Sequence, residues 1–203
     1  WEFIHHFVSN LTNLRYKVEI VGLDKLPKEG PLLIISNHVS FIDWAFLGRI
    51  RKEHIRFVMW YHFYEMPILK TFFSAAGAIP IAGKNENNKY FTGAFDQMEV
   101  ALKDKEFLLF FPEGGITKDG QVDTFRGGII EVLKRHGKPI TILPSYVDGL
   151  WESIFSRNPI KWKGFIKRII GRRKIKVILG EPILADQNTT VEGLREKVLS
   201  LSL

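Results

Sequence analysis

The stretch PLLIISNHVSFID, residues 31–43, decides the fold of this chain. Its first five residues are one of the two longest apolar runs, and a continuous run of this kind is typical of a strand buried on both faces of a sheet. Polar and titratable side chains follow at once, at Asn37, His38 and Asp43. In an open α/β sheet, the loop that leaves the carboxyl end of a strand is the usual place for a functional site. The stretch therefore predicts a buried strand that ends in a candidate site.

Similar apolar runs recur along the chain between helix-like segments. Besides 32–36, we expect strands at 16–21, 55–60, 78–81, 107–111, 140–146 and 175–179. Apolar residues at three-four spacing predict amphipathic helices over 91–102 and 125–136. Gly137 suits a left-handed helix end, and Thr190 suits the start of a last helix over 191–199. The sequence thus predicts an α/β fold: one domain, with a mixed sheet of about seven strands flanked by helices.

Length and composition limit the possible chemistry. The 203 residues, 45% hydrophobic and 25% charged, fit one globular domain, and no internal repeat is found. The chain has no cysteine, which excludes a disulfide framework, a thiolate zinc site and a covalent cysteine intermediate. Any nucleophilic chemistry must therefore use oxygen or nitrogen.

The ends and the apolar runs indicate how the chain relates to a membrane. The longest apolar runs, 31–35 and 107–112, are far shorter than the ~18 residues that a membrane-spanning helix needs. Residues 1–14 carry charged and amide side chains where a signal peptide needs an apolar region. The sequence begins with Trp1 rather than methionine, so we expect a processed or excised chain whose membrane anchor could lie outside it.

His38 and Asp43 could act together as a base and its orienting partner. Imidazole titrates near neutral pH, and a carboxylate on its second nitrogen fixes the tautomer and stabilises the cation that forms on proton uptake. A structural interpretation is also open, since residues 40–43 match the S-x-x-D pattern of a helix N-cap. Asp43 would then cap a helix that begins at Phe41. The two interpretations are compatible.

Two further stretches end expected strands in a similar way. In FPEGGIT, residues 111–117, Glu113 leaves an apolar run and enters a glycine pair that would let backbone amides approach a ligand. A surface turn with a solvated Glu113 is the alternative. In GAIPIAGK, residues 77–84, Lys84 could hold a phosphate as a point charge. An ordinary solvated lysine is equally consistent with the pattern.

Four of these blocks, in order, resemble a known family. They are NHVSFID (37–43), GAIPI (77–81), FPEG (111–114) and ILP (142–144). Together they resemble the signature of the glycerophospholipid acyltransferases, whose best-known members are the 1-acylglycerol-3-phosphate acyltransferases. FRGG (125–128) and GEPI (180–183) also lie where that family has a similar pattern. The resemblance extends from about residue 22 to residue 183.

The resemblance implies an enzyme, a lysophospholipid O-acyltransferase, with the glycerolipid acyltransferase fold. A fatty acyl group would pass from acyl-CoA or an acyl-acyl-carrier protein to a free hydroxyl of the lipid, with no bound cofactor, no metal and no acyl-enzyme. His38 would be the general base and Asp43 its orienting partner. The substrate-binding residues would be Asn37, Ser40, Lys84, Glu113, Gly114, Gly115 and Thr117.

Departures from the common family pattern bear on the acceptor. Members that act on lysophosphatidic acid commonly continue Glu-Gly with Thr-Arg-Ser, whereas this chain has Gly115, Ile116 and Thr117. Gly83 stands where an arginine is common. The variants NHVSFID and PEGxIT resemble the 2-acylglycerophosphoethanolamine acyltransferase branch. Members of that branch re-acylate lysophospholipids whose headgroup is intact, and they are often fused to a lysophospholipid transporter, an acyl-activating domain, or both. We therefore expect a lysophosphatidylethanolamine-type acceptor, with lysophosphatidic acid as the alternative.

The positive charge is concentrated in one segment. The net charge is +7, but residues 157–176 contain nine basic and no acidic residues, which leaves −2 for the remainder. That placement favours a membrane surface over nucleic acid. Apolar side chains alternate with the cations, as in interfacial segments. The expected membrane-binding residues are Trp162, Lys167, Arg168, Arg172 and Arg173.

Other interpretations of these segments stay open. The basic segment could be a solvated face whose apolar side packs on the core, or it could dock an acidic acyl-carrier protein. The apolar stripe of an amphipathic helix over 1–14 could lie on a membrane or cover the sheet. We expect membrane association at the cytoplasmic face of the inner membrane or an equivalent surface.

Two other functions remain possible on the residues alone. A metal-dependent phosphoesterase could use His38, Asp43 and Glu113 as ligands, since an imidazole and two carboxylates can bind Zn or Mn. A non-catalytic lipid-binding module could use the basic segment alone.

Overall fold

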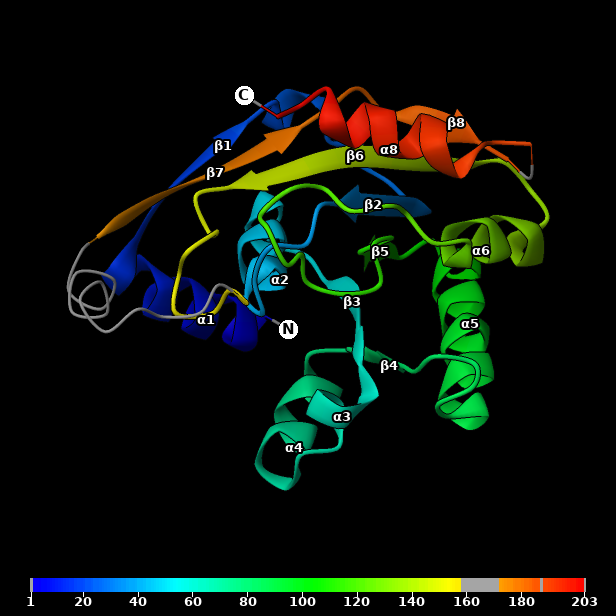
Figure 1. Cartoon of the computed structure of the whole chain (residues 1–203), viewed down its shortest axis with the longest axis horizontal. Helices are drawn as coiled ribbons and strands as arrows, with labels where there is room; N and C mark the ends of the chain where they lie inside the picture. Colours follow the sequence, from blue (N-terminus) through cyan, green and yellow to red (C-terminus); the bar gives the residue numbers. More distant parts are fainter. Residues whose placement is uncertain (1, 158–171, 187, 203) are drawn as a thin grey trace.

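The computed structural model describes residues 2–157, 172–186 and 188–202. Eight strands form one sheet (Figure 1). They are β1 (Tyr16–Val21), β2 (Leu32–Ser36), β3 (Ile55–Trp60), β4 (Ile79–Ile81), β5 (Phe107–Phe110), β6 (Ile140–Asp148), β7 (Arg173–Leu179) and β8 (Ile183–Ala185). Their order across the sheet is β1-β7-β6-β2-β5-β3-β4, with β8 beside β6.

The sheet is mixed, as the sequence predicts. Strands β2 to β6 run parallel to one another, whereas β7 and β8 run antiparallel to β6, and β1 runs parallel to β7. β2 lies in the middle, between β5 and β6, and every residue of it is buried. This central position explains its continuous apolar run, because neither face nor either edge of the strand meets water.

The prediction of about seven strands misses β8. β7 and β8 occupy successive stretches of the same edge of β6, with Leu179 opposite Ser145 and Ile183 opposite Ile142. Pro182 lies in the gap between them and has no backbone N–H to continue the pairing. β8 is three residues long, too short for a sequence period to identify.

Seven helices occur within the described ranges. They are α1 (Glu2–Arg15), α2 (Asp43–Leu47), α3 (Tyr61–Tyr64), α4 (Pro67–Ala75), α5 (Asn88–Lys103), α6 (Gly128–His136) and α8 (Val191–Leu199). The predicted helix ends are confirmed: Gly137 has a φ of 69°, and the Thr190 hydroxyl accepts a hydrogen bond from the amide of Gly193. The sequence did not predict α3 and α4, which project from one side of the sheet (Figure 1).

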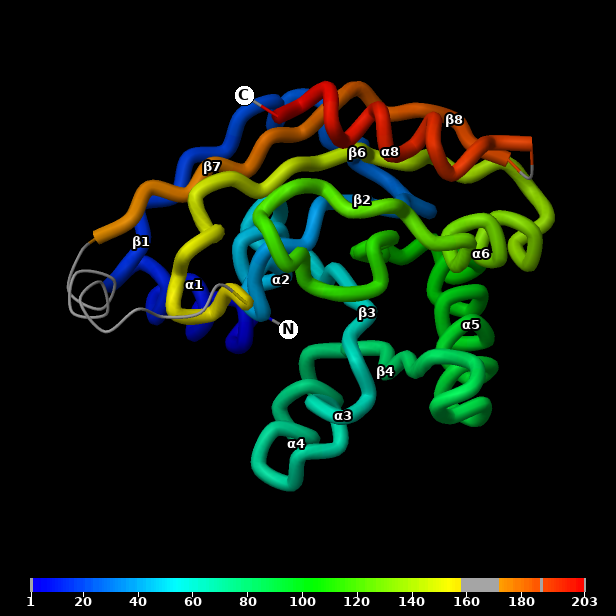
Figure 2. The backbone as a smooth tube through the Cα atoms, viewed as in Figure 1, coloured from blue at the N-terminus to red at the C-terminus, as the bar shows by residue number. Residues whose placement is uncertain are grey.

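Alternate residues of β2 belong to two separate cores. Leu32 and Ile34 pack on one face with residues of α2, and Ile4 of α1 packs against the same core. Leu33 and Ile35 pack on the other face, where α5, α6 and α8 contribute most of the partners. Figure 2 shows α5 and α6 side by side at one end of the sheet and α1 with α2 toward the other. The sheet is thus covered on both faces, and its strand ends are left for the functional loops.

Candidate functional site

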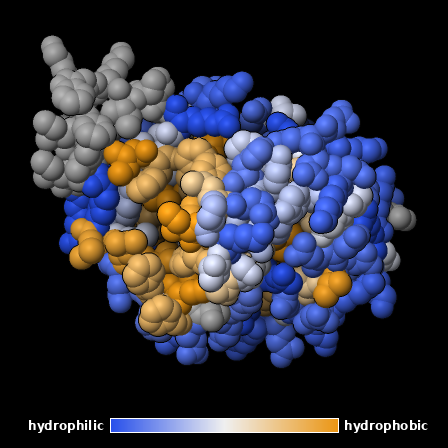
Figure 3. Space-filling model, turned by 90° about the horizontal axis from the view of Figure 1, so that it is seen from below, coloured by the Kyte–Doolittle hydropathy of each residue, from blue (hydrophilic) through white to orange (hydrophobic). Residues whose placement is uncertain are grey.

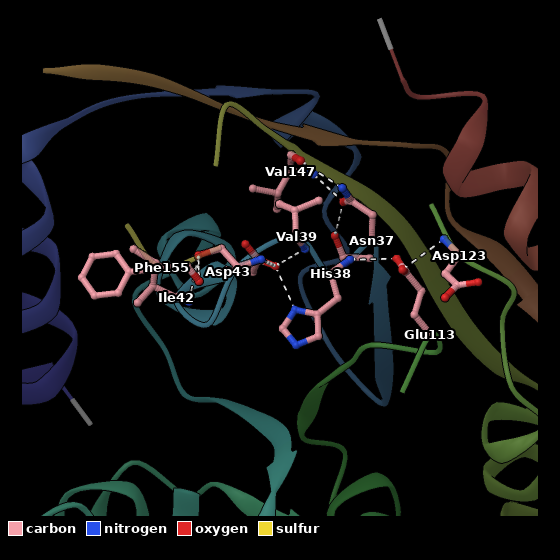
Figure 4. A network of polar contacts seen from close by, with 11 residues as sticks. Asn37, His38, Val39, Ile42, Asp43, Glu113, Asp123, Val147 and Phe155 are labelled. Atoms are coloured by element: carbon pink, nitrogen blue, oxygen red, sulfur yellow. Dashed lines mark hydrogen bonds and ion pairs between the residues drawn. The ribbon is translucent and has the colours of Figure 1, made fainter. Parts of the chain in front are cut away.

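The site forms where two neighbouring parallel strands end. β2 and β5 pair from Leu32 with Phe107 to Ile35 with Phe110. Their carboxyl ends therefore lie at the same edge of the sheet. The loop after β2 carries His38 and the loop after β5 carries Glu113, and the two loops meet (Figure 4). The two strand-end motifs thus lie in contact.

His38 and Asp43 form a direct contact within the first loop. Nδ1 of His38 lies 2.8 Å from Oδ2 of Asp43, and the Asp43 side chain is fully buried. The same carboxylate oxygen accepts hydrogen bonds from the backbone amides of Val39 (2.8 Å) and Ser40 (2.9 Å). Three donors thus converge on one oxygen and hold the loop in a tight turn around it.

The N-cap interpretation is confirmed in part, because the Asp43 carboxylate accepts from the Ser40 amide (2.9 Å) as the acidic residue of a capping box does, but the helix begins later than expected. Helix α2 begins at Asp43 itself, not at Phe41, and Ile42 is its N-cap, with no side chain capping the helix. The Asp43 carboxylate points back to the amides of Val39 and Ser40, which precede the helix. The S-x-x-D pattern therefore marks a tight loop in which backbone amides donate to the Asp43 carboxylate. The same carboxylate oxygen also contacts the imidazole of His38.

The electrostatics of the pair suit proton transfer. Burial raises the pKa of Asp43, while the hydrogen bonds from His38, Ser40 and Val39 act in the opposite direction. An ionised Asp43 can only accept at Nδ1, so the neutral imidazole carries its proton there and has its lone pair at Nε2. Within the described residues, Nε2 has no hydrogen-bond partner. The ring is 19% exposed and points toward the side of the β3–α4 segment, drawn in teal (Figure 4).

The ring of Phe111 supports the imidazole from one side. The two rings stack with centroids 4.2 Å apart and planes 19° apart. Phe111 itself is buried and belongs to the core. The imidazole is therefore fixed by a hydrogen bond at one edge and by an aromatic face below it.

The loop after β5 holds the backbone of His38 on both sides. Oε1 of Glu113 accepts a hydrogen bond from the His38 amide (2.8 Å), and the amide of Thr117 donates to the His38 carbonyl (2.8 Å). The second oxygen of Glu113 accepts from the amide of Asp123 (3.1 Å). We call this arrangement the His38 clamp: Glu113 and Thr117 together with the backbone of His38.

Glu113 is buried, not the solvated turn residue of the alternative interpretation. Only 3% of it is exposed. Burial raises the pKa of its carboxyl group to about 7, against the opposing effect of the hydrogen bonds from the amides of Asp123 and His38. The ionised form, which can accept both amides, is therefore lost as the pH falls through about 7.

Asn37 and Ser40, both predicted to bind substrate, are buried against protein partners. The Asn37 side chain donates to the carbonyl of Val147 (3.0 Å) and accepts from its amide (2.8 Å), so it continues the pairing of β2 with β6. The Ser40 hydroxyl donates to the carbonyl of Phe155 (3.3 Å). Their contact with substrate stays a prediction, while these hydrogen bonds place both residues in the support of the loop.

The other predicted substrate-binding residues are placed as follows. Thr117 is buried, and its hydroxyl donates to Asp119. Gly114 has a φ of 67°, and it and Gly115 follow Glu113 near the surface. Lys84 is exposed in the turn after β4 and takes no part in the clamp. Their substrate contacts also stay predictions.

The expected membrane residues are only partly described. Trp162, Lys167 and Arg168 lie outside the residues that the structure describes. Arg172 is exposed and donates to the carbonyl of Asn13 (3.1 Å), and Arg173 in β7 donates to the carbonyl of Trp151 (2.9 Å). No helix among the described residues is both long and apolar enough to cross a membrane.

Arg126 is a site residue that the sequence analysis did not identify. A Cβ on Gly114 would lie 2.8 Å from Cδ of Arg126 and 3.0 Å from its Nε, so the arginine side chain lies directly over this glycine. Arg126 is exposed, and its guanidinium has no hydrogen-bond or ion-pair partner in the described part of the chain. The FRGG block was the available signal, but nothing in the sequence indicated that it folds back onto Gly114.

The three titratable residues of the site do not form a metal centre. Among residues 2–157, 172–186 and 188–202, no group of three His, Asp or Glu side chains could hold a metal ion. Both oxygens of Glu113 accept from backbone amides. The geometry gives no support to a metal-dependent phosphoesterase that uses His38, Asp43 and Glu113.

Comparisons with known proteins agree with this geometry. The 1-acyl-sn-glycerol-3-phosphate acyltransferase LPAT1, chloroplastic, of Arabidopsis thaliana is 27% identical over 88% of this chain and 48% of its own length. The enzyme of the same name, BAT2, from Brassica napus is 27% identical over 67% of this chain and 40% of its own length. The chain thus spans about half the length, or less, of these curated relatives.

The fold also matches a solved structure. The crystal structure of the 1-acyl-sn-glycerophosphate acyltransferase PlsC from Thermotoga maritima superimposes with a TM-score of 0.70, 18% identity, and coverage of 97% of this chain and 74% of that one. A family model described as Acyltransferase matches residues 17–148, which include both loops of the site. The chain therefore belongs to the Acyltransferase family, as its four sequence blocks predict.

Proposed function

We propose that this chain transfers a fatty acyl group from an acyl thioester to the free hydroxyl of a lysophospholipid. The observation that carries the proposal is the His38–Asp43 pair, in which Nδ1 is bound to a buried carboxylate while Nε2 has no partner among the described residues. The names of the relatives, which are 1-acyl-sn-glycerol-3-phosphate acyltransferases, support the same class of reaction. We propose that, as in that class, no bound cofactor or metal takes part.

The geometry supports a direct transfer. Nε2 of His38 removes the proton of the acceptor hydroxyl as its oxygen attacks the thioester carbon, and Asp43 stabilises the imidazolium that forms. The tetrahedral intermediate then collapses, the carbon–sulfur bond breaks, and the imidazolium returns its proton to the leaving thiolate. The chain has no cysteine to form a thioester of its own, which is consistent with attack by the lipid hydroxyl. The donor is acyl-CoA or an acyl-acyl-carrier protein.

Arg126 is placed to hold the phosphate of the acceptor. Its side chain covers Gly114, whose amide donates to the carbonyl of Phe111, and the Phe111 ring carries the imidazole. A lysophospholipid carries its phosphate on the same glycerol backbone as its free hydroxyl, within a few bonds of it. One free guanidinium matches the single charge of a phosphodiester, and guanidinium binds phosphate well. The acceptor that we propose is therefore a lysophospholipid of the lysophosphatidylethanolamine type, with its headgroup intact.

A panel of lysolipids with acyl-CoA and acyl-carrier-protein donors tests this proposal. In the presence of a chelator, we expect turnover of lysophosphatidylethanolamine to exceed that of lysophosphatidic acid. Arg126→Ala should raise KM for the lysolipid about ten-fold, since a hydrogen bond to a charged group is lost, with a smaller change in kcat.

Lys118→Ala is the matched control, because Lys118 is an exposed cation in the same loop with no ion-pair partner in the described ranges. Arg126→Lys should restore part of the affinity. A strong preference for lysophosphatidic acid would contradict the headgroup assignment. An unchanged KM in Arg126→Ala would contradict the role of the guanidinium.

Two exposed apolar groups support the proposal that the chain works at a membrane surface. One is the outer face of α1, with Phe3, Phe7, Leu11 and Leu14, of which Phe3 is 82% and Leu14 81% exposed. The other comprises Phe41 before α2, Trp60 at the end of β3, and Met66 and Ile68 at and in the start of α4, of which Ile68 is 91% exposed. Figure 3, which views the molecule from the side on which α3 and α4 project, shows apolar side chains gathered on one part of this face. Monomers rarely expose such patches unless they bind something.

The basic segment would add electrostatic attraction to an anionic leaflet. We expect charge reversal at Arg172 and Arg173 to weaken binding to phosphatidylglycerol-containing vesicles at least ten-fold, because each cation near an anionic surface contributes ~1 kcal/mol. Vesicle flotation at two salt concentrations measures this. Charge reversal at Lys134 and Lys138, two exposed cations on and after α6, changes the net charge equally and is the control. If both charge-reversal variants lost vesicle binding equally, only the net charge of the chain would matter. If the variant at Arg172 and Arg173 bound as well as the wild type, a role for the segment would be contradicted.

Partners and location follow from the same proposal. The chain would act on membrane lipids at the cytoplasmic face of the inner membrane or an equivalent surface, with coenzyme A thioesters or an acyl-carrier protein as donor. Transporter or acyl-activating domains in the same polypeptide would fit the branch that its sequence variants resemble. A nucleic-acid partner is not expected.

A further inference from the structure

Within the part of the chain that the structure describes, Arg195 of the C-terminal helix α8 hydrogen-bonds to the loop between β5 and α6. Nε of Arg195 donates to the carbonyl of Asp123 (3.0 Å), and Nη2 donates to the carbonyl of Val122 (3.0 Å). The third contact, from Nη1, goes to Glu192 of the same helix (3.1 Å). Arg195 thus binds two successive backbone carbonyls in the loop between β5 and α6.

The loop that Arg195 holds is also the outer support of the His38 clamp. The carbonyl of Asp123 receives Arg195, while the amide of Asp123 donates to Oε2 of Glu113 (3.1 Å). The other oxygen of Glu113 accepts from the His38 amide (2.8 Å). Three successive hydrogen-bonded contacts therefore connect α8 to the backbone of the catalytic histidine.

We propose that Arg195 is a positioning residue for His38, which acts through residues 122–123 and Glu113. This inference rests on the proposed function of His38 as general base. Without Arg195, the 122–123 segment keeps few polar attachments to the rest of the fold, and the Asp123 amide no longer has a fixed direction. Glu113 then loses one of the two donors that orient its carboxylate, and the clamp loosens at the amide of His38. Displacement of a catalytic group by about 1 Å can reduce the rate up to 10²-fold.

The clamp has a titration that reports on this connection. Ionised Glu113 accepts one amide at each oxygen, whereas the protonated carboxyl has an O–H that donates and an oxygen that accepts more weakly than a carboxylate oxygen does. The hydrogen bond from Asp123 lowers the pKa of Glu113, which burial raises to about 7. Removal of Arg195 weakens that hydrogen bond, so the pKa of Glu113 should rise further and the ionised, clamp-competent form should be lost at a higher pH. The charged and titratable groups around Glu113 are His38, Asp43, Asp123, Arg126 and Tyr146.

The experiment compares Arg195→Ala with two matched variants of the same helix. Lys197→Ala removes an exposed cation of α8 that does not touch the loop, and Glu192→Ala removes the partner of Nη1 while the two loop contacts remain. In Arg195→Ala we expect kcat for lysophosphatidylethanolamine to fall about ten-fold with little change in KM. We expect the acid side of the pH profile of kcat to move to higher pH. Both controls should stay within about two-fold of the wild type, and Arg195→Lys should recover part of the rate, because an ammonium can reach one carbonyl.

A spectroscopic measurement separates this inference from the proposed function. The carboxyl carbon of Glu113, labelled with 13C and assigned through Glu113→Gln, should titrate near pH 7 in the wild type and at higher pH in Arg195→Ala. That shift can be measured without turnover. If the chain had no acyltransferase activity, the proposed function would be overturned, but the titration of Glu113 would still test the connection from Arg195 to His38. An unshifted Glu113 titration in a folded Arg195→Ala variant would overturn the inference. So would a rate loss of the same size in Lys197→Ala.

Discussion

Replacement of His38 with alanine should reduce acyl transfer to the limit of detection while the fold persists. General-base catalysis typically contributes ~10² to 10⁴ in rate, and no other histidine in the described ranges is paired with a buried carboxylate at a strand end. The backbone of residue 38 would still pair with Glu113 and Thr117, because the clamp uses only its amide and carbonyl. Initial rates with a radiolabelled acyl donor measure the loss.

The controls for His38→Ala must show that the variant loses the chemical step and not its fold or its substrate binding. His136→Ala removes an imidazole at the end of α6, remote from the two loops, and should keep wild-type activity. Circular dichroism and urea unfolding should give a folded His38→Ala protein with a cooperative transition. Residual activity above about one tenth of the wild-type rate in His38→Ala would contradict the role of His38 as the base, and retained binding of lysolipid would show that only the chemical step is lost.

Asp43→Asn should have the second-largest effect, a fall in kcat of about 10²-fold or more. The amide oxygen of asparagine can take the place of Oδ2 and accept from His38, Val39 and Ser40, so the turn can persist. The negative charge is lost, and the imidazolium that forms during attack is no longer stabilised by a buried carboxylate. The measurement is kcat at saturating lysolipid, with KM expected to change little.

The geometry also predicts a cost in stability for this variant. Oδ1 of Asp43 is buried without a hydrogen-bond partner, so the NH2 group of asparagine would be placed where the described residues offer no acceptor. The free energy of unfolding should fall by about 1 to 3 kcal/mol, the usual effect of a buried unsatisfied polar group. Asp43→Ala, which removes the acceptor of all three donors, should be less stable still. Normal kcat in a folded Asp43→Asn protein would show that the charge is not needed.

Most strands of the sheet could be predicted from the sequence because they depend on local pattern. Continuous apolar runs such as 32–35 and 107–110 leave no solvent face and identify central strands. Parallel strands that are both buried end at the same edge, which brings His38 and Glu113 together. The central strands were therefore predicted, whereas the contact between the two loops is a finding of the fold.

What could not be predicted depends on contacts between distant parts of the chain. Asn37 has a polar side chain that looks available for substrate, yet it pairs with Val147, 110 residues away. Arg126 and Arg195 are ordinary surface cations in the sequence, and only the fold places one over Gly114 and the other on Asp123. Helix α3 has four residues, too few to show a helical period. Helix α4 does carry apolar residues at three-four spacing, at Leu69, Phe72 and Phe73, and this signal in the sequence was missed.

The His38 clamp limits how this loop can change in length. Glu113 and Thr117 hold the two sides of one peptide segment, so the number of residues between them is fixed by the distance from the His38 amide to its carbonyl. An insertion at 114–116 would release one side of the histidine, whereas residues 118–121 lie beyond both attachment points. Variation in loop length among relatives, and any loop grafted to change acceptor choice, should therefore be confined to residues 118–121, between Thr117 and the segment that Arg195 and Glu113 hold.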